Sequence, residues 1–283
     1  MSAPLHGSRD AYETFPLDRV ELQCGLTLRN ATLAYTTYGE LNADKSNAIV
    51  YPTWYSGRHW ENEWLIGRGH GLDPEKYFII VPNMLGDGLS SSPSNTPAPY
   101  DMARFPNVTL YDNVTLRHRL VTEKFGIGKI KLVVGWSMGA QQTNQWGCLY
   151  PDMVERIAPF CGSAKTAPHN FAFPEGVKAA LTNDVAWNNG WYDTPPTKGL
   201  RGVGRVYAGW GLSQPFYMQE LWRAMGYSSL EDFFIVVEAS SCSRMRTTCW
   251  PCCGPGSTVT SAPTRCSTAT SKRRSAPSKP RPW

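Results

Sequence analysis

Short apolar runs and amphipathic stretches alternate over the first 165 residues of the chain. The stretch ELQCGLTLRNATLAYTTYGEL (residues 21–41) alternates apolar and polar positions, which predicts an antiparallel hairpin near the N-terminus. Two apolar runs, NAIVYPTWYSG (47–57) and YFIIVPNMLGDG (77–88), stop in turn residues, as strands buried on both faces do.

Helical and strand patterns then follow each other regularly. NVTLYDNVTLRHRLVTEKFGIGKI (107–130) predicts a helix that leads into the strand KLVVGWS (131–137). GAQQTNQWGCLYPDMV (139–154) predicts the next helix, and ERIAPFCGS (155–163) a further strand. Strands alternating with helices at this spacing predict the α/β class, with an open, mostly parallel sheet and helices on both faces.

The pattern changes twice along the chain, which suggests three parts. Residues 1–165 form the predicted sheet-and-helix core. Residues 166–238 combine helical stretches with a tryptophan-rich loop and predict a helical cap above the strand ends. Residues 239–283 contain no Leu, Ile, Phe, Tyr, Asp or Glu, but nine Ser, seven Thr, six Pro and five of the eight Cys. As written, this tail is expected to be disordered.

The net charge of +5 belongs to the tail. Residues 1–238 hold 20 basic and 23 acidic residues, a net charge of −3, whereas residues 239–283 hold eight basic residues and no acid. The chain has no run of 18 apolar residues, and its N-terminus lacks the apolar stretch of a secretory signal. We therefore expect a cytoplasmic protein without a membrane span.

The strand-to-helix junction GWSMG carries the clearest candidate chemistry. Gly-x-Ser-x-Gly between a strand and a helix is typical of the nucleophile elbow, a sharp turn that presents the serine hydroxyl at the carboxyl end of the sheet. Ser137 is the candidate nucleophile, and Gly135 and Gly139 would be small because the strand and helix backbones crowd together there. The backbone N–H of Met138 would supply one oxyanion-hole donor, and that of Trp54 or Tyr55 the other.

Four segments carry a resemblance to a known family. ATLAYTTYGELNADKSNAIV, YFIIVPNMLGDG, KLVVGWSMGAQQ and GLRGVGRVYAGW occur in the order and spacing of the homoserine O-acetyltransferase family of α/β-hydrolases, over about residues 15–238. The resemblance implies an α/β-hydrolase fold and acyl transfer in which Ser137 carries the acyl group from acetyl-CoA to homoserine, a step of methionine biosynthesis, or to a similar alcohol. It also implies that Arg205 faces the substrate side of the pocket.

The chain departs from this family at two places. Its elbow reads GWSMGA where the transferases usually have Gly-Gly-Ser-Met-Gly-Gly, and YAGWGLSQPFY replaces their Ser/Thr-Tyr-Arg stretch. A carboxylester hydrolase of the same fold is therefore the alternative enzyme, since water and an alcohol compete for the same acyl-enzyme. Either enzyme implies small-molecule substrates, with acetyl-CoA as donor for the transferase, and no bound cofactor, nucleic acid or membrane. A homodimer is one option for the assembly.

The catalytic histidine is not recognisable in this sequence. In α/β-hydrolases the triad follows the order Ser, Asp, His, yet only His169 of the five histidines follows Ser137. His169 begins a predicted cap helix, where the family has a structural segment. His59 and His70 lie near loops on the pocket side, where the polarity of a loop accounts for them. The chain therefore offers a nucleophile without an evident base.

The composition of the tail allows three interpretations. Cys249, Cys252, Cys253 and Cys266 suggest a redox or zinc site, but the flanking helix and the second Cys-x-x-Cys pair are missing, so no metal is expected. A basic interaction segment would bind nucleic acid or an anionic surface without catalysis. The third interpretation is a frameshift. Read one base earlier, residues from 239 can encode GFFL and then DANNLLAMLWTWQHGDIS, which resembles the family's cap. We expect this shift, which removes the triad Asp and His and leaves the chain inactive.

Overall fold

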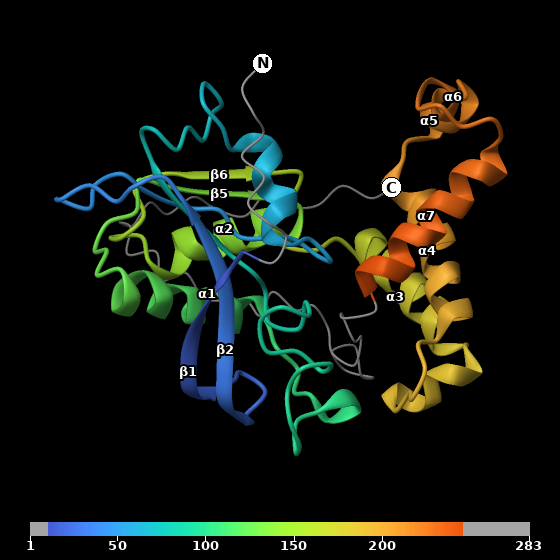
Figure 1. Cartoon of the computed structure of the whole chain (residues 1–283), viewed down its shortest axis with the longest axis horizontal. Helices are drawn as coiled ribbons and strands as arrows, with labels where there is room; N and C mark the ends of the chain where they lie inside the picture. Colours follow the sequence, from blue (N-terminus) through green and yellow to red (C-terminus); the bar gives the residue numbers. More distant parts are fainter. Residues whose placement is uncertain (1–10, 246–283) are drawn as a thin grey trace, which may run out of the picture.

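The computed structural model describes residues 11–245, which contain one six-stranded sheet (Figure 1). The strands are β1 (Glu13–Glu21), β2 (Thr27–Tyr38), β3 (Ala48–Val50), β4 (Phe78–Pro82), β5 (Leu132–Trp136) and β6 (Ile157–Phe160). Their order is β1-β2-β4-β3-β5-β6. β2 pairs antiparallel with β1 and β4, and the other three pairings are parallel. This confirms the predicted α/β class with a mostly parallel sheet.

The hairpin and the buried strands follow the hydrophobic pattern. β1 and β2 pair from Glu13 opposite Tyr35 to Glu21 opposite Thr27, so the first strand begins earlier than the alternation from residue 21 indicates. β4 is buried at all five positions. Its Ile80 packs into the apolar cluster on one face of the sheet, while Ile79 and Val81 pack into the cluster on the other. Burial on both faces explains why this strand is an unbroken apolar run.

Helices α1 (Leu110–Arg119) and α2 (Met138–Leu149) pack against the same face of the sheet. α1 begins at a capping box, in which Thr109 accepts a hydrogen bond from the Asp112 N–H at 3.2 Å and Asp112 accepts one from the Thr109 N–H at 2.8 Å. The π-helical turn η3 (Leu120–Lys124) extends α1. On the opposite face, Leu65 of η1 (His59–Leu65) packs against the second cluster, and the segment after η1 contributes Ile66 and Leu72 to it.

A second group of helices forms a layer beside the sheet (Figure 1). It consists of α3 (Pro168–Thr182), the 3₁₀ turn η4 (Val185–Gly190), α4 (Thr197–Gly211), α5 (Gln214–Met218), α6 (Leu221–Ala224) and α7 (Leu230–Met245). These helices have apolar clusters of their own, one of which includes Val177, Leu181 and Leu200. The layer meets the core where the Arg104 guanidinium of η2 (Met102–Arg104) lies 4.8 Å from the centre of the Trp191 ring.

Helix α7 crosses the point at which the composition changes. It runs seven residues past Glu238, to Met245. Residues 239–245 are therefore helical, whereas the composition of this segment predicts disorder from residue 239. The Cα of Glu238 and the hydroxyl of Ser241 lie against Gly204 of α4, so this part of α7 continues to pack on α4. The basic tail from residue 246 lies outside the described residues, and so do the four cysteines of the redox or zinc interpretation, Cys249, Cys252, Cys253 and Cys266.

Candidate active site

Ser137 lies in the turn between β5 and α2. Its backbone has φ of +54° and ψ of −119°, a conformation that is strained for any residue with a side chain. The Ser137 N–H donates to the Phe160 carbonyl of β6 at 2.9 Å, and the Ser137 carbonyl accepts from the Ala140 N–H at 2.9 Å. Strain held in place by the neighbouring strand is the backbone signature expected of a nucleophile elbow.

The glycines around Ser137 are required by close backbone contacts. A Cβ on Gly135 would lie 2.2 Å from the Gly139 carbonyl oxygen, and one on Gly139 would lie 2.9 Å from the Pro52 carbonyl oxygen. Gly162, after β6, would place a Cβ 2.7 Å from the Ser137 carbonyl oxygen. The predicted crowding at Gly135 and Gly139 is thereby confirmed. These contacts also show that the loop after β3 lies directly against the Ser137 turn.

Two of the three predicted oxyanion-hole residues have backbone N–H groups without a bonded acceptor in the described part of the chain. Met138 is the first residue of α2, so its N–H has no partner inside the helix. Trp54 follows β3 in the loop that touches Gly139, and no acceptor is bonded to its N–H either. The Tyr55 side chain packs against the apolar cluster that includes Val177, Leu181 and Leu200. This agrees with the packing role that the sequence also allowed for the aromatic side chains of this loop.

A buried amide that sequence reasoning missed connects these two segments. Gln142 of α2 is fully buried, and its Nε2 donates to the Thr53 carbonyl at 3.0 Å and to the Met138 carbonyl at 3.2 Å. The sequence could place Gln142 one helical turn after Met138, on the same face of the predicted helix. The sequence could not show that its partner is the Thr53 carbonyl, 89 residues earlier in the chain.

Histidine side chains are engaged elsewhere in the described part of the chain. His59 is buried, its backbone N–H donates to Asn83 Oδ1 at 3.0 Å, and its Nδ1 lies 3.1 Å from Asn83 Nδ2. Since an amide nitrogen only donates, the proton of the neutral ring is placed on Nε2. Burial lowers the pKa of His59 and so favours this neutral form.

The other described histidines also lie in separate environments. His118 stacks on Tyr150 with ring centres 4.0 Å apart, and His169 of α3 lies 4.7 Å from the Trp210 ring in the cap. His70 is exposed on the loop after η1. Among residues 11–245, no histidine is hydrogen-bonded to Ser137. His6 lies outside these residues.

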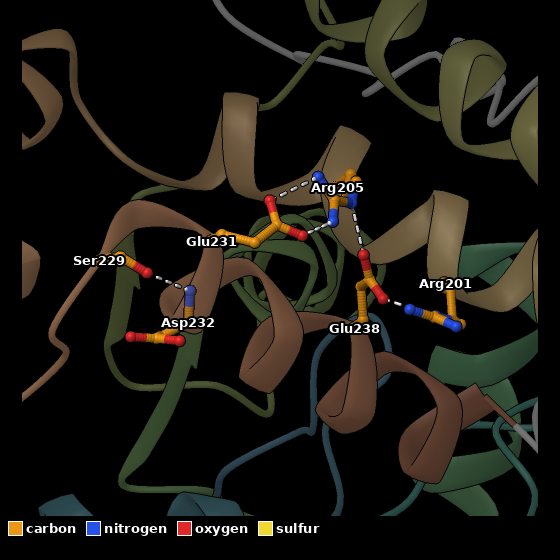
Figure 2. A network of polar contacts seen from close by, with 6 residues as sticks. All are labelled: Arg201, Arg205, Ser229, Glu231, Asp232 and Glu238. Atoms are coloured by element: carbon orange, nitrogen blue, oxygen red, sulfur yellow. Dashed lines mark hydrogen bonds and ion pairs between the residues drawn. The ribbon is translucent and has the colours of Figure 1, made fainter.

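Arg205 takes part in an ion-pair network between α4 and α7 (Figure 2). Its guanidinium bonds both Glu238 and Glu231, with Nη1 3.3 Å from Glu231 Oε2. Glu238, buried between the helices, also accepts from Arg201 Nε at 2.6 Å. Hydrogen bonds from Arg201 and Arg205 lower the pKa of Glu238, and those to Glu231 and Glu238 raise the pKa of Arg205.

This network fits a structural arginine better than a free substrate-binding one. Two carboxylates already bind the Arg205 guanidinium, and its Cζ lies 5.3 Å from the centre of the Phe234 ring. A planar guanidinium that binds a substrate carboxylate needs a pair of free parallel N–H groups. The substrate-binding role stays a prediction, while the structure assigns Arg205 the joining of α4 to α7.

Metal and membrane features are not found in the described part of the chain. Within residues 11–245, no group of three or more His, Cys, Asp or Glu side chains is arranged to hold a metal ion. No helix in that range combines the length and apolarity needed to cross a bilayer. The four cysteines described there, Cys24, Cys148, Cys161 and Cys242, are not in disulfides.

Comparison with known proteins ranks esterases above acetyltransferases. A probable esterase of Corynebacterium glutamicum is 45% identical over 225 residues, which are 78% of this chain and 64% of that protein. The ethyl acetate hydrolase of Pseudomonas veronii is 42% identical over 231 residues, 81% of this chain and 65% of that protein. The homoserine O-acetyltransferase of Methanohalobium evestigatum is 37% identical over 202 residues, 65% of this chain and 41% of that protein.

The expected resemblance to homoserine O-acetyltransferases is thus present, at lower identity than the resemblance to esterases. The chain spans just under two thirds of the length of the two esterases. A solved acetylester hydrolase from Corynebacterium glutamicum superposes with a TM-score of 0.81 at 40% identity, over 86% of this chain and 72% of that one. Residues 57–210 match the family model of the alpha/beta hydrolase fold. The chain therefore belongs to the alpha/beta hydrolase family.

Proposed function

We propose that this chain is a carboxylester hydrolase for short acyl groups, in which Ser137 is the nucleophile that accepts the acyl group. The observation that carries the proposal is the strained backbone at Ser137, between a parallel strand and a helix, beside a loop with an unbonded N–H. The named activities of the two esterases at 45% and 42% identity support an ester substrate over an acyl-CoA. This replaces acetyl transfer to homoserine as the leading function.

The proposed chemistry has two steps. The Ser137 hydroxyl oxygen bonds to the acyl carbon, the ester C–O bond breaks, and the alcohol leaves with the serine proton. Met138 and Trp54 would donate their N–H groups to the negative oxygen that forms on the acyl carbon. Water then attacks the same carbon, and the carboxylic acid and the free serine are released. Because no histidine bonds Ser137 among residues 11–245, we expect slow acylation and still slower release.

Acylation of Ser137 by an activated ester tests this proposal. The full chain is incubated with p-nitrophenyl acetate at pH 8, p-nitrophenol release is followed, and the acetylated residue is located by mass spectrometry. We expect acetate on Ser137 in the wild type, with p-nitrophenol release slower by roughly two orders of magnitude or more in Ser137→Ala. Acetylation of other residues at the same rate in both proteins would contradict the assignment.

Acyl transfer to an alcohol is the second candidate, because of the 37% identity to a homoserine O-acetyltransferase. It is separated from hydrolysis by the product. The acetylated chain is incubated with and without homoserine, and in a parallel reaction acetyl-CoA replaces the ester as donor. A hydrolase releases acetate in both cases, whereas a transferase forms O-acetylhomoserine. Formation of that product from acetyl-CoA would restore the transferase assignment.

A further inference from the structure

The amide of Gln142 has an orientation that its surroundings determine. Its Nε2 lies 3.0 Å from the Thr53 carbonyl oxygen and 3.2 Å from the Met138 carbonyl oxygen, and both of these oxygens can only accept. The opposite orientation would place Gln142 Oε1 against two other oxygens. Met84 Sδ, a weak acceptor, lies farther from Nε2 at 3.5 Å, so the Nε2 hydrogens are directed mainly at the two segments that meet beside Ser137.

The other end of the same amide lowers stability. Gln142 Oε1 is buried and has no hydrogen-bond partner among the described residues. A buried carbonyl oxygen without a donor costs free energy, which an apolar side chain of similar size would avoid. Helix packing alone therefore favours a residue such as leucine at this position. The distinctive contribution of glutamine is the pair of donors that Nε2 supplies.

Thr53 is held from two sides. Its N–H and its hydroxyl both donate to the Pro82 carbonyl at the end of β4, each at 3.4 Å, and its own carbonyl accepts from Gln142. In a planar trans peptide the C=O and the following N–H point in opposite directions. Gln142, by fixing the Thr53 carbonyl toward α2, also fixes the Trp54 N–H away from the interior of α2.

We propose that Gln142 is a positioning residue that aligns the Trp54 N–H as an oxyanion-hole donor. This inference rests on the proposed acylation of Ser137. One side chain joins the peptide that contains the Trp54 N–H to the carbonyl of Met138, whose N–H is the other candidate donor. A single amide thus ties the Thr53–Trp54 peptide to the first turn of α2, which begins at the Met138 N–H.

Single-turnover acylation by p-nitrophenyl acetate tests this role in the full chain. Gln142→Leu removes both donors at nearly constant volume, and Gln142→Glu keeps the shape while replacing the amide nitrogen by a carboxylate oxygen. Gln141→Leu is the matched control, because Gln141 Nε2 bonds the Thr166 hydroxyl at 3.3 Å and no hydrogen bond joins it to the loop among the described residues. Thermal unfolding and hydrogen exchange of the Thr53 amide are measured for every variant.

A role in the transition state predicts a specific pattern. At saturating ester, both Gln142 variants should acylate Ser137 at least about tenfold more slowly, with a half-saturating ester concentration close to the wild-type value. The Thr53 amide should exchange faster. Wild-type acylation rates in Gln142→Leu, or an equal loss in Gln141→Leu, would overturn the inference.

The two proposals can fail separately. If wild-type Ser137 is not acylated, the proposed function fails, and the exchange data alone decide whether Gln142 holds the loop. Unchanged exchange of the Thr53 amide in Gln142→Leu would then overturn the positioning role. Faster exchange in that variant, with normal exchange in Gln141→Leu, would support it.

Discussion

The residues around Ser137 differ in how far the sequence reveals their roles. Ser137, Gly135 and Gly139 could be recognised because the sharp turn demands particular residue types at fixed spacing. Gln142 could not, because its role depends on a carbonyl 89 residues earlier in the chain. Local backbone demands leave a sequence signature, whereas a side-chain bond between distant segments appears only when the chain is folded.

Gly135 tests how strictly the turn excludes a side chain. A Cβ at this position would meet the Gly139 carbonyl oxygen at 2.2 Å and the Thr143 hydroxyl at 2.5 Å, so β5 and α2 would have to move apart. We expect Gly135→Ala to lower the free energy of unfolding by about 2 kcal/mol or more and to abolish acylation of Ser137. Urea unfolding and the acylation assay measure the two effects.

Gly209 provides the matched control. It lies on the exposed side of α4, and an alanine Cβ at this position would have no described atom within 4 Å. Alanine is the better helix former, so Gly209→Ala should raise the free energy of unfolding by about 0.5–1 kcal/mol. Equal destabilisation by both substitutions would show that crowding at Gly135 is not the cause of the lower free energy of unfolding.

The elements could be predicted better than the pairings between them. The apolar runs and amphipathic stretches gave β3 to β6, α1 and α2 close to their observed positions, because periodicity is a local property. The partners of Arg205 could not be predicted in this way. An arginine on α4 can face a ligand or a neighbouring helix, and the choice depends on where Glu231 and Glu238 of α7 lie.

The stability that the Glu238 ion pairs give to the contact between α4 and α7 should depend on pH. Hydrogen bonds from Arg201 and Arg205 lower the pKa of Glu238 from its ordinary value of 4.5 in the folded chain. Its contribution to stability is therefore complete above about pH 4.5 and is lost as the pH falls through the lower folded pKa. At pH 7, Glu238→Gln should lower the unfolding temperature by about 2 °C or more.

Unfolding temperatures at pH 7 and pH 3 check this prediction. The difference between wild type and Glu238→Gln should shrink at pH 3, because below about pH 4.5 this carboxyl group takes up a proton more readily in the unfolded chain than in the folded one. Glu175→Gln is the control, because Glu175 is exposed on α3 and has no ion pair among the described residues. A difference for Glu238→Gln that is the same at both pH values would exclude an electrostatic origin.

At the scale of the whole molecule, the fold class followed from the order of elements, but the unequal edges of the sheet did not. β1 forms one edge of the described sheet, and its exposed positions include Asp18, Arg19 and Glu21. β6 forms the other edge within residues 11–245, and its exposed side chains include Ile157 and Phe160. Charged edges resist pairing with other chains, and apolar edges permit it. Only the folded structure shows which strand is left at an edge.

The β6 edge should therefore cause the chain to self-associate. Ile157 is 42% exposed and Phe160 47% exposed, and Trp136 of the adjacent strand adds a further exposed ring to the same part of the sheet. A charge placed on this strand would make the burial of its edge between two chains unfavourable. We expect Ile157→Lys to reduce self-association in light scattering and sedimentation across a concentration series, and to leave the unfolding temperature nearly unchanged.

A lysine elsewhere on the apolar surface separates edge pairing from a general effect of charge. Val185 is 95% exposed in η4, far along the chain from β6 and outside the sheet, so Val185→Lys adds the same charge without altering the edge. If β6 is the contact, only Ile157→Lys shifts the distribution toward the single chain, and the shift persists at high salt, where repulsion between whole molecules is screened. An equal shift for both variants that disappears at high salt would place the cause in net charge and leave the β6 edge without a role in association.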